Sequence, residues 1–427
     1  MKLAVIGGGS TYTPELIDGV LRRRDRLPVT EISLCDINEK RLDVVAGFAR
    51  RMVAHSGGGI DIHTTSDHRE AVRGARFVVS QFRIGQQQAR HRDEMLGREF
   101  NLVGQETVGV GGFAKGLRTI PVALRLADAI LDVAPEAQLL NFTNPAGMVT
   151  EALLRERPKL KTIGLCNVPW NVKNEIATTL GYDFKDLELD YVGLNHLSWV
   201  RGIKAEGSDI SESAIGGFRG LTGKQAPGDD DPIWQPENID ILKAIPNYYL
   251  LYYYETQQWL RYQKNHPTRA SEVMTIEAGL LEQYADPTLT EKPADLMKRG
   301  GAYYSDSAAE LMADIATDAQ TIHIVNARND GAVPGMNPDE VMELPCVISA
   351  DGAKPLATSA MRPDINALVR TVKDFELLTI RAAVDADEDS AIRALITNPL
   401  GPDLSVAPSV WKRLKEEHRG LLGGLDD

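Results

Sequence analysis

The feature that most constrains the fold is an alternation of apolar, strand-like runs with helical segments across residues 1–165. Short apolar runs favour buried strands, and the longer amphipathic segments between them favour helices. Strict alternation of the two builds a parallel sheet with helices on both faces. The expected strands are KLAVIGGG, EISLCDI, RFVVSQF, QLLNFTN and KTIGL, and the expected helices span residues 14–24, 41–55, 119–133 and 147–155. The sequence therefore predicts a doubly wound α/β domain of the Rossmann type over residues 1–165.

Beyond residue 165 the pattern becomes less regular, which predicts a second, mixed α/β catalytic and substrate domain over residues 166–427. Residues 206–238 are rich in Gly, Ser, Asp and Pro and are expected to form an exposed excursion. The aromatic run YYLLYYYE is expected to be helical, as are residues 305–317 and 363–385. Two domains in a chain of this length are expected to share a cleft.

Composition limits the classes of partner. The 427-residue chain carries 47 Lys and Arg against 60 Asp and Glu, a formal net charge of −13 at pH 7. Such a surface repels nucleic acids and anionic membranes, so neither is expected as a partner, and an anionic substrate needs a local cationic pocket. The three cysteines lie far apart in the sequence, which argues against disulfides and for a reducing compartment. No signal-like segment precedes the first strand and no apolar run reaches roughly 18 residues, so the expected location is the cytoplasm.

The segment AVIGGGSTYTPELIDGVL places glycines where the first expected strand turns into the first helix. Gly7 and Gly9 permit a tight turn there. The backbone N–H groups of Gly9, Ser10 and Thr11 are then expected to hold a pyrophosphate at the helix N-terminus. Tyr12 stands where the usual fingerprint has its third glycine, which weakens the motif.

Asp36 strengthens the nucleotide interpretation because it ends the second expected strand, in LCDIN. A carboxylate at that place accepts hydrogen bonds from ribose hydroxyls and repels a 2′-phosphate, which favours NAD over NADP. Thr13 is expected to cap the first helix, and Pro14 suits its first position. The alternative is a structural glycine turn beside a solvated aspartate. The ordered succession of strand, turn, helix, strand and acid favours the nucleotide.

Cys166 and His196 are the candidate residues for chemistry in the middle of the chain. Each has an ordinary structural interpretation, because a cysteine or a histidine in an apolar strand is most often a buried core residue. Cys166 could also be a nucleophile or a soft metal ligand. It follows an expected strand at the edge where doubly wound folds bind their ligands, which favours a functional role. Two protein ligands would leave open positions on a divalent ion, as a catalytic metal site requires.

The motifs of the chain, taken in order, resemble those of a known enzyme family. They are GGGSTYTPEL, RIGQQQAR, GQET, NFTNPAG, GLCNVP, GLNHLSW, YYLLYYY and HPTRASE. This succession is similar to that of the NAD- and manganese-dependent glycoside hydrolases of family 4, and it covers most of the chain. Within the family, the Cys-Asn-Val-Pro form is most similar to the branch that hydrolyses 6-phospho-β-glucosides such as cellobiose 6-phosphate. The resemblance implies NAD and a divalent metal, Mn²⁺ foremost, a phosphorylated sugar substrate, and a homodimer or homotetramer.

The resemblance also implies roles for individual residues. Cys166 and His196 match the metal ligands of the family. Tyr249 matches the tyrosine that acts as the catalytic base, with Tyr248 and Tyr252 of the same run as alternatives. The alternative for most of these tyrosines is an aromatic stripe in the core of a helix.

Four further positions match residues that contact the substrate. Arg90 and Asn144 match residues that hold the sugar, and Arg269 matches an arginine on the phosphate side. Asn167 follows the metal cysteine where the α-acting branches carry an aspartate, so it is expected to bear on catalysis and on the anomer bound. Surface ion pairs are the alternative for the two arginines, and a helix cap is the alternative for Asn144.

The mechanism that the resemblance implies differs from that of most glycosidases, which use two carboxylates flanking the glycosidic bond. NAD⁺ takes hydride from C3 of the sugar, a base removes the acidified C2 proton, the aglycone leaves C1, water adds, and the hydride returns. Three alternatives stay open: another family 4 glycosidase with an α-linked or unphosphorylated substrate, a 2-hydroxy acid dehydrogenase of the lactate or malate dehydrogenase layout, and a non-catalytic NAD or sugar sensor. The dehydrogenase would need Asp-x-x-Arg where this chain has Cys-Asn-Val-Pro, and the sensor would not need a pair of metal ligands.

Overall fold

The computed structural model describes residues 1–224, 230–299 and 304–426 of the chain. Its centre is a nine-stranded sheet in the order β13-β12-β11-β6-β5-β4-β1-β2-β3. The strands are β1 (Lys2–Ile6), β2 (Glu31–Cys35), β3 (Asp61–Thr65), β4 (Phe77–Ser80), β5 (Gln138–Asn141), β6 (Thr162–Gly164), β11 (Thr321–Arg328), β12 (Val341–Ser349) and β13 (Gly352–Pro355). The first six strands in the sequence are parallel, which confirms the predicted α/β fold.

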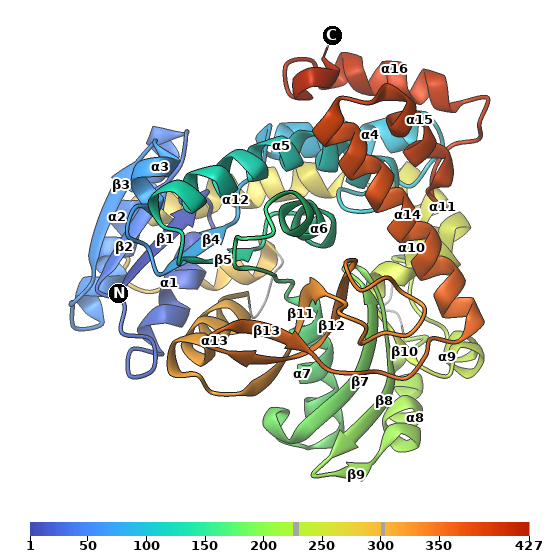
Figure 1. Ribbon diagram of the computed structural model, residues 1–427, viewed down its shortest axis with the longest axis horizontal. Helices are drawn as coiled ribbons and strands as arrows, with labels where there is room; N and C mark the ends of the chain where they lie inside the picture. Colours follow the sequence, from blue (N-terminus) through green and yellow to red (C-terminus); the bar gives the residue numbers. More distant parts are fainter. Residues whose placement is uncertain (225–229, 300–303, 427) are drawn as a thin grey trace.

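The last three strands of the sheet come from the second half of the chain and run antiparallel. β11 pairs with β6 through Asn326 and Gly164, and β12 and β13 continue the sheet outward. Gly164 is required at this junction because a Cβ there would lie 2.2 Å from the hydroxyl of Thr150 and 2.8 Å from the Cβ of Asn326. The boundary near residue 165 between a nucleotide domain and a catalytic domain stays a prediction, but both halves contribute to one sheet (Figure 1).

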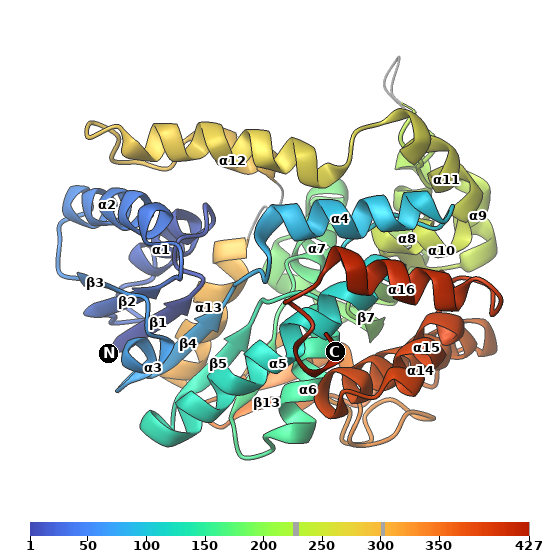
Figure 2. The same cartoon turned by 90° about the horizontal axis from the view of Figure 1, so that it is seen from above.

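Helices cover both faces of the sheet and extend beyond it. From the first half come α1 (Thr13–Leu21), α2 (Glu39–His55), α3 (His68–Val72), α4 (Gln86–Glu99), α5 (Gly109–Val133) and α6 (Ala146–Glu156). From the second half come α12 (Arg269–Ala285), α13 (Tyr304–Thr317), α14 (Pro363–Asp385), α15 (Glu388–Thr397) and α16 (Ala407–Glu417). Figure 2 shows α12 lying along both α2 and α4, so a helix of the second half spans the first.

A smaller antiparallel sheet lies beside the main one. It contains β7 (Leu187–Leu194), β8 (Leu197–Ala205), β9 (Ser208–Asp209) and β10 (Ile245–Pro246), and α7 (Val168–Leu180) connects it to β6. The aromatic run expected to form one helix is instead a 3₁₀ turn, η2 (Tyr248–Leu250), followed by the short α10 (Leu251–Tyr254) and then α11 (Thr256–Asn265). The side chain of Asn247 holds the start of this turn, since its Oδ1 accepts from the backbone N–H of Tyr249 at 2.9 Å.

Three local expectations are corrected by the structure. Helix α5 begins ten residues before its expected start at 119, because its glycines are there for close packing: a Cβ on Gly111 would lie 2.0 Å from the carbonyl of Gln105. The expected excursion at 206–238 contains β9, the helix α8 (Ser211–Leu221) and the start of α9 (Pro236–Leu242), and residues 225–229 lie outside the described residues. Thr13 does not cap α1; its hydroxyl donates to the carbonyl of Gly8 at 2.8 Å and so holds the glycine turn.

The largest group of buried apolar side chains is shared by both halves of the chain. It includes Leu34 and Phe113 from the first half and Trp199, Leu344 and Phe375 from the second. Within the described residues, no helix is both long enough and apolar enough to cross a membrane.

Candidate active site

Cys166 and His196 meet at the junction of the two sheets. Cys166 follows β6, and His196 lies in the tight connection between β7 and β8 with a positive φ of 64°. The Cys166 Sγ lies 3.5 Å from the His196 Nε2. Both side chains are buried, with 9% and 4% of their surface exposed. The structure therefore brings together the two residues expected to bind a metal.

The tautomer of His196 follows from its second ring nitrogen. The Thr107 hydroxyl donates to Gln105 Oε1 at 2.8 Å, so its oxygen accepts the hydrogen bond from His196 Nδ1 at 2.9 Å. The proton is then on Nδ1, and the lone pair of Nε2 points toward Cys166. Burial lowers the pKa of His196 to about 3, which keeps the imidazole neutral, as a metal ligand must be.

The distance between the two ligand atoms fits a shared cation. The Cys166 Sγ and the His196 Nε2 lie 3.5 Å apart, and thiolate sulfur and imidazole nitrogen are both ligands of divalent ions. Across residues 1–224, 230–299 and 304–426, no group of three or more His, Cys, Asp or Glu side chains is arranged to hold a metal. A cation held by Cys166 and His196 would therefore keep positions open for substrate oxygens.

Helix α7 begins directly behind the sulfur. The backbone N–H of Val168 donates to the Cys166 Sγ at 3.5 Å, and the N–H of Asn167 also bonds this sulfur. Burial raises the pKa of Cys166 to about 12, whereas these helix N-terminal donors favour the thiolate, and a coordinated cation would favour it further. Asn167 is half-buried at the first position of the turn, directly beside the cysteine.

Tyr249 stacks on the metal-site histidine. Its ring centroid lies 3.9 Å from that of His196, with an angle of 4° between the planes. Tyr248 is 46% exposed and its ring meets that of Tyr249 edge-on, and Tyr252 is buried beside Tyr249. Burial raises the pKa of Tyr249, and the nearby Cys166 and Glu106 raise it further. Of the three tyrosines considered from the sequence, Tyr249 is the one that contacts the ligand pair.

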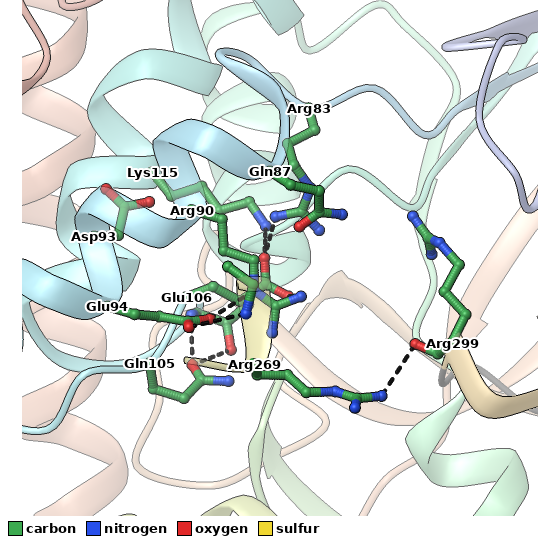
Figure 3. Close-up of polar contacts among 12 residues, drawn as sticks. Arg83, Gln87, Arg90, Asp93, Glu94, Gln105, Glu106, Lys115, Arg269 and Arg299 are labelled. Carbon is green, nitrogen blue, oxygen red and sulfur yellow. Dashed lines mark hydrogen bonds and ion pairs between the residues drawn. The ribbon is translucent and has the colours of Figure 1, made fainter. Parts of the chain in front are cut away.

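Arg90 belongs to a buried cluster of cations around one carboxylate. It contacts Glu94 at 2.7 Å and Glu106 at 3.2 Å, and Lys115 contacts Glu106 at 2.6 Å. Figure 3 shows Arg83 converging on Glu106 as well. Burial disfavours the charge of Glu106, yet the three cations hold its pKa well below its usual value. Sequence reasoning assigned Arg90 alone in this cluster, although the GQET motif contains Glu106 and the histidine partner Thr107.

Arg269 lies at the start of α12, and its side chain extends toward the backbone of Arg299 (Figure 3). Its side chain is 45% exposed, pairs with Glu272 at 2.9 Å, and donates to the carbonyl of Lys298 at 3.1 Å. Arg299 lies beside it, with its guanidinium 4.0 Å above the ring of Tyr12 and its Nε 2.9 Å from Glu277. No motif of the sequence pointed to Arg299. Together the two arginines form a rim in which each guanidinium pairs with a glutamate, Arg269 with Glu272 and Arg299 with Glu277.

Asn144 begins the turn into α6, and its peptide bond to Pro145 is cis. Its Oδ1 accepts from the N–H of Ala146 at 3.2 Å, so it does serve the start of the helix, as its structural alternative predicts. A sugar-binding role for Asn144 stays a prediction.

The glycine turn leaves no room for side chains. Cβ atoms on Gly7, Gly8 and Gly9 would lie 2.8 Å from Phe82 N, 2.8 Å from Leu34 Cβ and 2.9 Å from Asp36 Oδ2. Asp36 accepts from the N–H of Gly9 at 3.0 Å, and so ties the turn to the end of β2. A cradle of this shape fits a dinucleotide backbone, and its closeness to Asp36 fits a ribose at the expected place.

Two of the three N–H groups expected at the pyrophosphate already have partners. The N–H of Gly9 bonds Asp36, as noted, and the N–H of Ser10 donates to the carbonyl of Gly7 at 3.0 Å. Thr11 is fully buried. The pyrophosphate role of Gly9, Ser10 and Thr11 therefore stays a prediction.

Comparison with known proteins connects this geometry to a family. Residues 2–182 match the family 4 glycosyl hydrolases, and residues 191–401 match the C-terminal domain of the same family. The chain is 41% identical to a probable 6-phospho-beta-glucosidase of Bacillus subtilis, over 99% of this chain and 97% of that protein. It is 36% identical to a 6-phospho-beta-glucosidase of Thermotoga maritima, over 98% of this chain and 99% of that protein.

Solved structures show the same likeness. The Thermotoga maritima 6-phospho-beta-glucosidase, solved with manganese, NAD⁺ and glucose-6-phosphate, has a TM-score of 0.91 at 35% identity, covering 98% of each chain. A 6-phospho-alpha-glucosidase from gut microorganisms, solved with NAD and Mn²⁺, has a TM-score of 0.89 at 25% identity, covering 98% of each chain. A lactate dehydrogenase of Eimeria maxima, at 16% identity and a TM-score of 0.55 over 90% of this chain and 94% of that one, shares the fold alone.

Proposed function

The chain belongs to family 4 of the glycosyl hydrolases, and from that premise we propose that it is an NAD- and metal-dependent glycosidase that hydrolyses 6-phospho-β-glucosides. The observation that carries the proposal is the stack of Tyr249 on His196, with the sulfur of Cys166 3.5 Å from the same imidazole. This arrangement puts a phenol beside a two-ligand metal site with open positions. A simple 2-hydroxy acid dehydrogenase would not need it, and neither would a sensor.

Bound NAD⁺ supplies a reversible hydride acceptor, and a bound divalent cation, Mn²⁺ foremost, supplies a Lewis acid for vicinal sugar oxygens. Cys166 and His196 would hold the cation, and the glycine turn with Asp36 would hold the nucleotide. Tyr249 removes the proton from C2 of the sugar once C3 is a ketone, and the aglycone then leaves C1. Burial alone disfavours the phenolate of Tyr249, so a cation beside it is needed for it to act as a base near neutral pH.

Substrate binding is assigned to side chains around this centre. Arg90 and Asn144 hold the sugar hydroxyls, and Arg269 binds the 6-phosphate, assisted by Arg299 on the same rim. The relatives named for 6-phospho-β-glucosides are 36–41% identical to this chain, whereas those named for α-linked substrates are 25–28% identical. Asn167 beside Cys166 supports the β side as well, since the α-acting branches of the family carry an aspartate there.

Three further expectations belong to the same proposal. The enzyme works in the cytoplasm, which is supported by three buried cysteines that are all free. It acts as a homodimer or homotetramer. Its residues 1–165 form the NAD-binding domain. Residues 166–427 form the catalytic and substrate domain and make the contacts between subunits.

An activity panel tests the proposed function. The substrates are 4-nitrophenyl β- and α-glucosides, each with and without a 6-phosphate, in the presence of NAD⁺, Mn²⁺ and a thiol reductant. We expect turnover of the β-linked, phosphorylated substrate only, with no net NADH. Equal turnover of the unphosphorylated β-glucoside would remove the phosphate role of Arg269, and preference for the α-linked substrate would place the enzyme in another branch of the family. Binding of the sugar without any turnover would favour the sensor.

A further inference from the structure

A buried carboxylate lies behind the metal-site pair and has no role in the proposed chemistry. Glu343, in β12, is 1% exposed. Its Oε1 accepts from Asn195 Nδ2 at 3.0 Å and from Asn326 Nδ2 at 3.3 Å, and its Oε2 accepts from the Tyr191 hydroxyl at 2.6 Å. Within the described parts of the chain no Lys, Arg or His lies within ion-pair distance of it. Burying a charge without a countercharge is costly, so a carboxylate retained here needs a reason.

One branch of hydrogen bonds leads from Glu343 to the metal-site sulfur. Asn195 directly precedes His196 in the sequence, and its side chain bonds both Glu343 and the sulfur of Cys166. A Cβ on Gly147 would lie 3.0 Å from the Cβ of Asn195, so the start of α6 packs against this amide. The carboxylate thus fixes which face of Asn195 meets the sulfur.

A second branch leads from Glu343 to the turn that carries Tyr249. The Tyr191 hydroxyl lies 2.6 Å from Ser198 Oγ, which accepts from Asn247 Nδ2 at 3.0 Å. The other end of that amide, Asn247 Oδ1, accepts from the backbone N–H of Tyr249 at 2.9 Å. These contacts are buried except at the last step.

Burial raises the pKa of Glu343 to about 7. In its ionised form the carboxylate sets the direction of the bonds at Tyr191 and Ser198, and the N–H of Tyr249, which only donates, sets the orientation of the Asn247 amide from the other end. An ionised carboxylate only accepts, so the Tyr191 hydroxyl must donate to it. Ser198 must then donate to Tyr191, which leaves its oxygen to accept from the amide nitrogen of Asn247. The amide oxygen of Asn247 is thereby turned toward the N–H of Tyr249. A group at position 343 that donates to the Tyr191 hydroxyl, as the amide nitrogen of glutamine can, would allow the Tyr191–Ser198 bond to reverse.

We propose that Glu343 is a positioning residue for both parts of the site: it orients Cys166 through Asn195, and it orients the Tyr249 turn through Tyr191. Partners of metal ligands commonly fix ligand orientation in this way, and their loss typically costs about 10–100-fold in metal affinity or activity. The inference rests on the proposed function only in taking Cys166 and His196 as metal ligands.

Cobalt binding tests the first branch without turnover. Co²⁺ bound to a cysteine thiolate gives a charge-transfer absorption whose position reports the sulfur's surroundings. In Glu343→Gln we expect Co²⁺ affinity to fall about 10–100-fold and the absorption to shift. The matched control is Glu340→Gln, since Glu340 is equally buried but pairs with Arg370; its affinity and absorption should match the wild type.

The outcomes separate this inference from the proposed function. Equal Co²⁺ affinity and absorption in folded Glu343→Gln and wild type would overturn the role of Glu343 alone. A wild type that binds no Co²⁺ would overturn the metal site and this inference together. Where Glu343→Gln does not fold by circular dichroism, Asn195→Ala breaks the same branch, and unchanged Co²⁺ binding in that variant overturns the inference.

Tyr191→Phe tests the second branch, because it removes one hydroxyl and leaves Glu343 bonded to Asn195. We expect its Co²⁺ affinity to stay within about threefold of the wild type while kcat falls at least tenfold and KM changes little. Loss of Co²⁺ affinity equal to that of Glu343→Gln would show that the network acts as one packing unit and would overturn the assignment of two branches. An unchanged kcat would overturn the link to Tyr249.

Discussion

At the scale of single residues, a hydrogen bond to Thr107 determines which ring nitrogen of His196 is free to bind a metal. The Nδ1–H of His196 donates to the Thr107 hydroxyl, so the lone pair of Nε2 faces Cys166. Where Cys166 and His196 are the two ligands, loss of either should abolish tight binding. We expect Cys166→Ala and His196→Ala each to lose bound Mn²⁺, measured by metal analysis after gel filtration. Cys346→Ala, at a fully buried cysteine of β12, is the control and should keep its metal. Normal metal content in either site variant would show that the pair belongs to the core only.

Tyr249 supplies the second prediction at this scale. Because its hydroxyl acts chiefly in the transition state, Tyr249→Phe should lower kcat by on the order of 10²–10⁴-fold with little change in KM. A C2-deuterated substrate should react more slowly in the wild type, and the product should acquire solvent deuterium at C2. Tyr248→Phe, at an exposed tyrosine that does not stack on His196, is the control and should keep its activity. Retention of the original hydrogen at C2 would exclude proton abstraction.

The residues of the site differ in how far the sequence predicts them. Cys166 could be singled out because it follows a strand at the binding edge of the sheet, and the family motifs pointed to His196 and Tyr249. The role of Glu343 could not be predicted, because the sequence does not show whether a single glutamate in an apolar strand faces the core or the solvent. Its role depends on the contacts of Tyr191 and Asn195, which only the fold brings together.

At the scale of elements, a buried ion pair joins α4, α5 and α16. Both carboxylate oxygens of Asp93 face Arg118, at 2.8 and 2.7 Å, and His418 Nε2 lies 2.8 Å from Asp93 as well. Burial alone would raise the pKa of Asp93, but Arg118 and His418 hold it below its usual value. The stabilisation is therefore fully present above the unfolded pKa near ~3.9 and is lost as pH falls through the lower, folded pKa.

Asp93→Asn tests this contact. The variant leaves Arg118 buried without its countercharge, so the free energy of unfolding at pH 7 should fall by about 3–5 kcal/mol. The difference between variant and wild type should shrink as pH falls below about 4, where the wild type loses its own contribution. Urea unfolding at several pH values measures both quantities. A difference that stays constant down to the acid limit would contradict the ionic origin of the stabilisation.

Among elements, strands and most helices follow from hydrophobic periodicity, but helix α5 shows its limit. Four glycines in its first eight residues argue against a helix by propensity. Gly111 and Gly112 are present because the GQET loop passes within contact distance of that surface. Tertiary packing overrides propensity there, and sequence alone does not show which backbone will lie against the helix.

At the scale of the whole molecule, both halves of the chain contribute to the main sheet and to the largest cluster of buried apolar side chains, so we expect them to unfold together. All five tryptophans lie at or beyond Trp170, whereas the nucleotide is expected at the glycine turn. Saturating NAD⁺, at 100 times its Kd, should stabilise the folded chain by about 2.7 kcal/mol. We expect tryptophan fluorescence and circular dichroism to report the same melting transition and the same upward shift with NAD⁺. A fluorescence transition at a different temperature, with no shift on addition of NAD⁺, would mean that the halves unfold independently.

NADP⁺ provides the control for this shift. Asp36 at the end of β2 should repel a 2′-phosphate, so NADP⁺ at the same concentration should shift the transition much less. Asp36→Ser should narrow the difference between the two nucleotides. An equal shift by both nucleotides in the wild type would contradict the role of Asp36 in binding the cofactor ribose.

The pairing of β11 with β6 also bears on how such a protein is inherited. Asn326 lies beside Gly164, two residues before the cysteine of the site, so the strand that presents Cys166 is completed by a segment encoded far downstream. A recombination that exchanged only the first 165 codons with those of an α-acting relative would join a foreign β6 to the native β11. Chimeras should fold best when residues 321–355 come from the same parent as the first half. In natural proteins of this architecture, the two gene segments are expected to be inherited together.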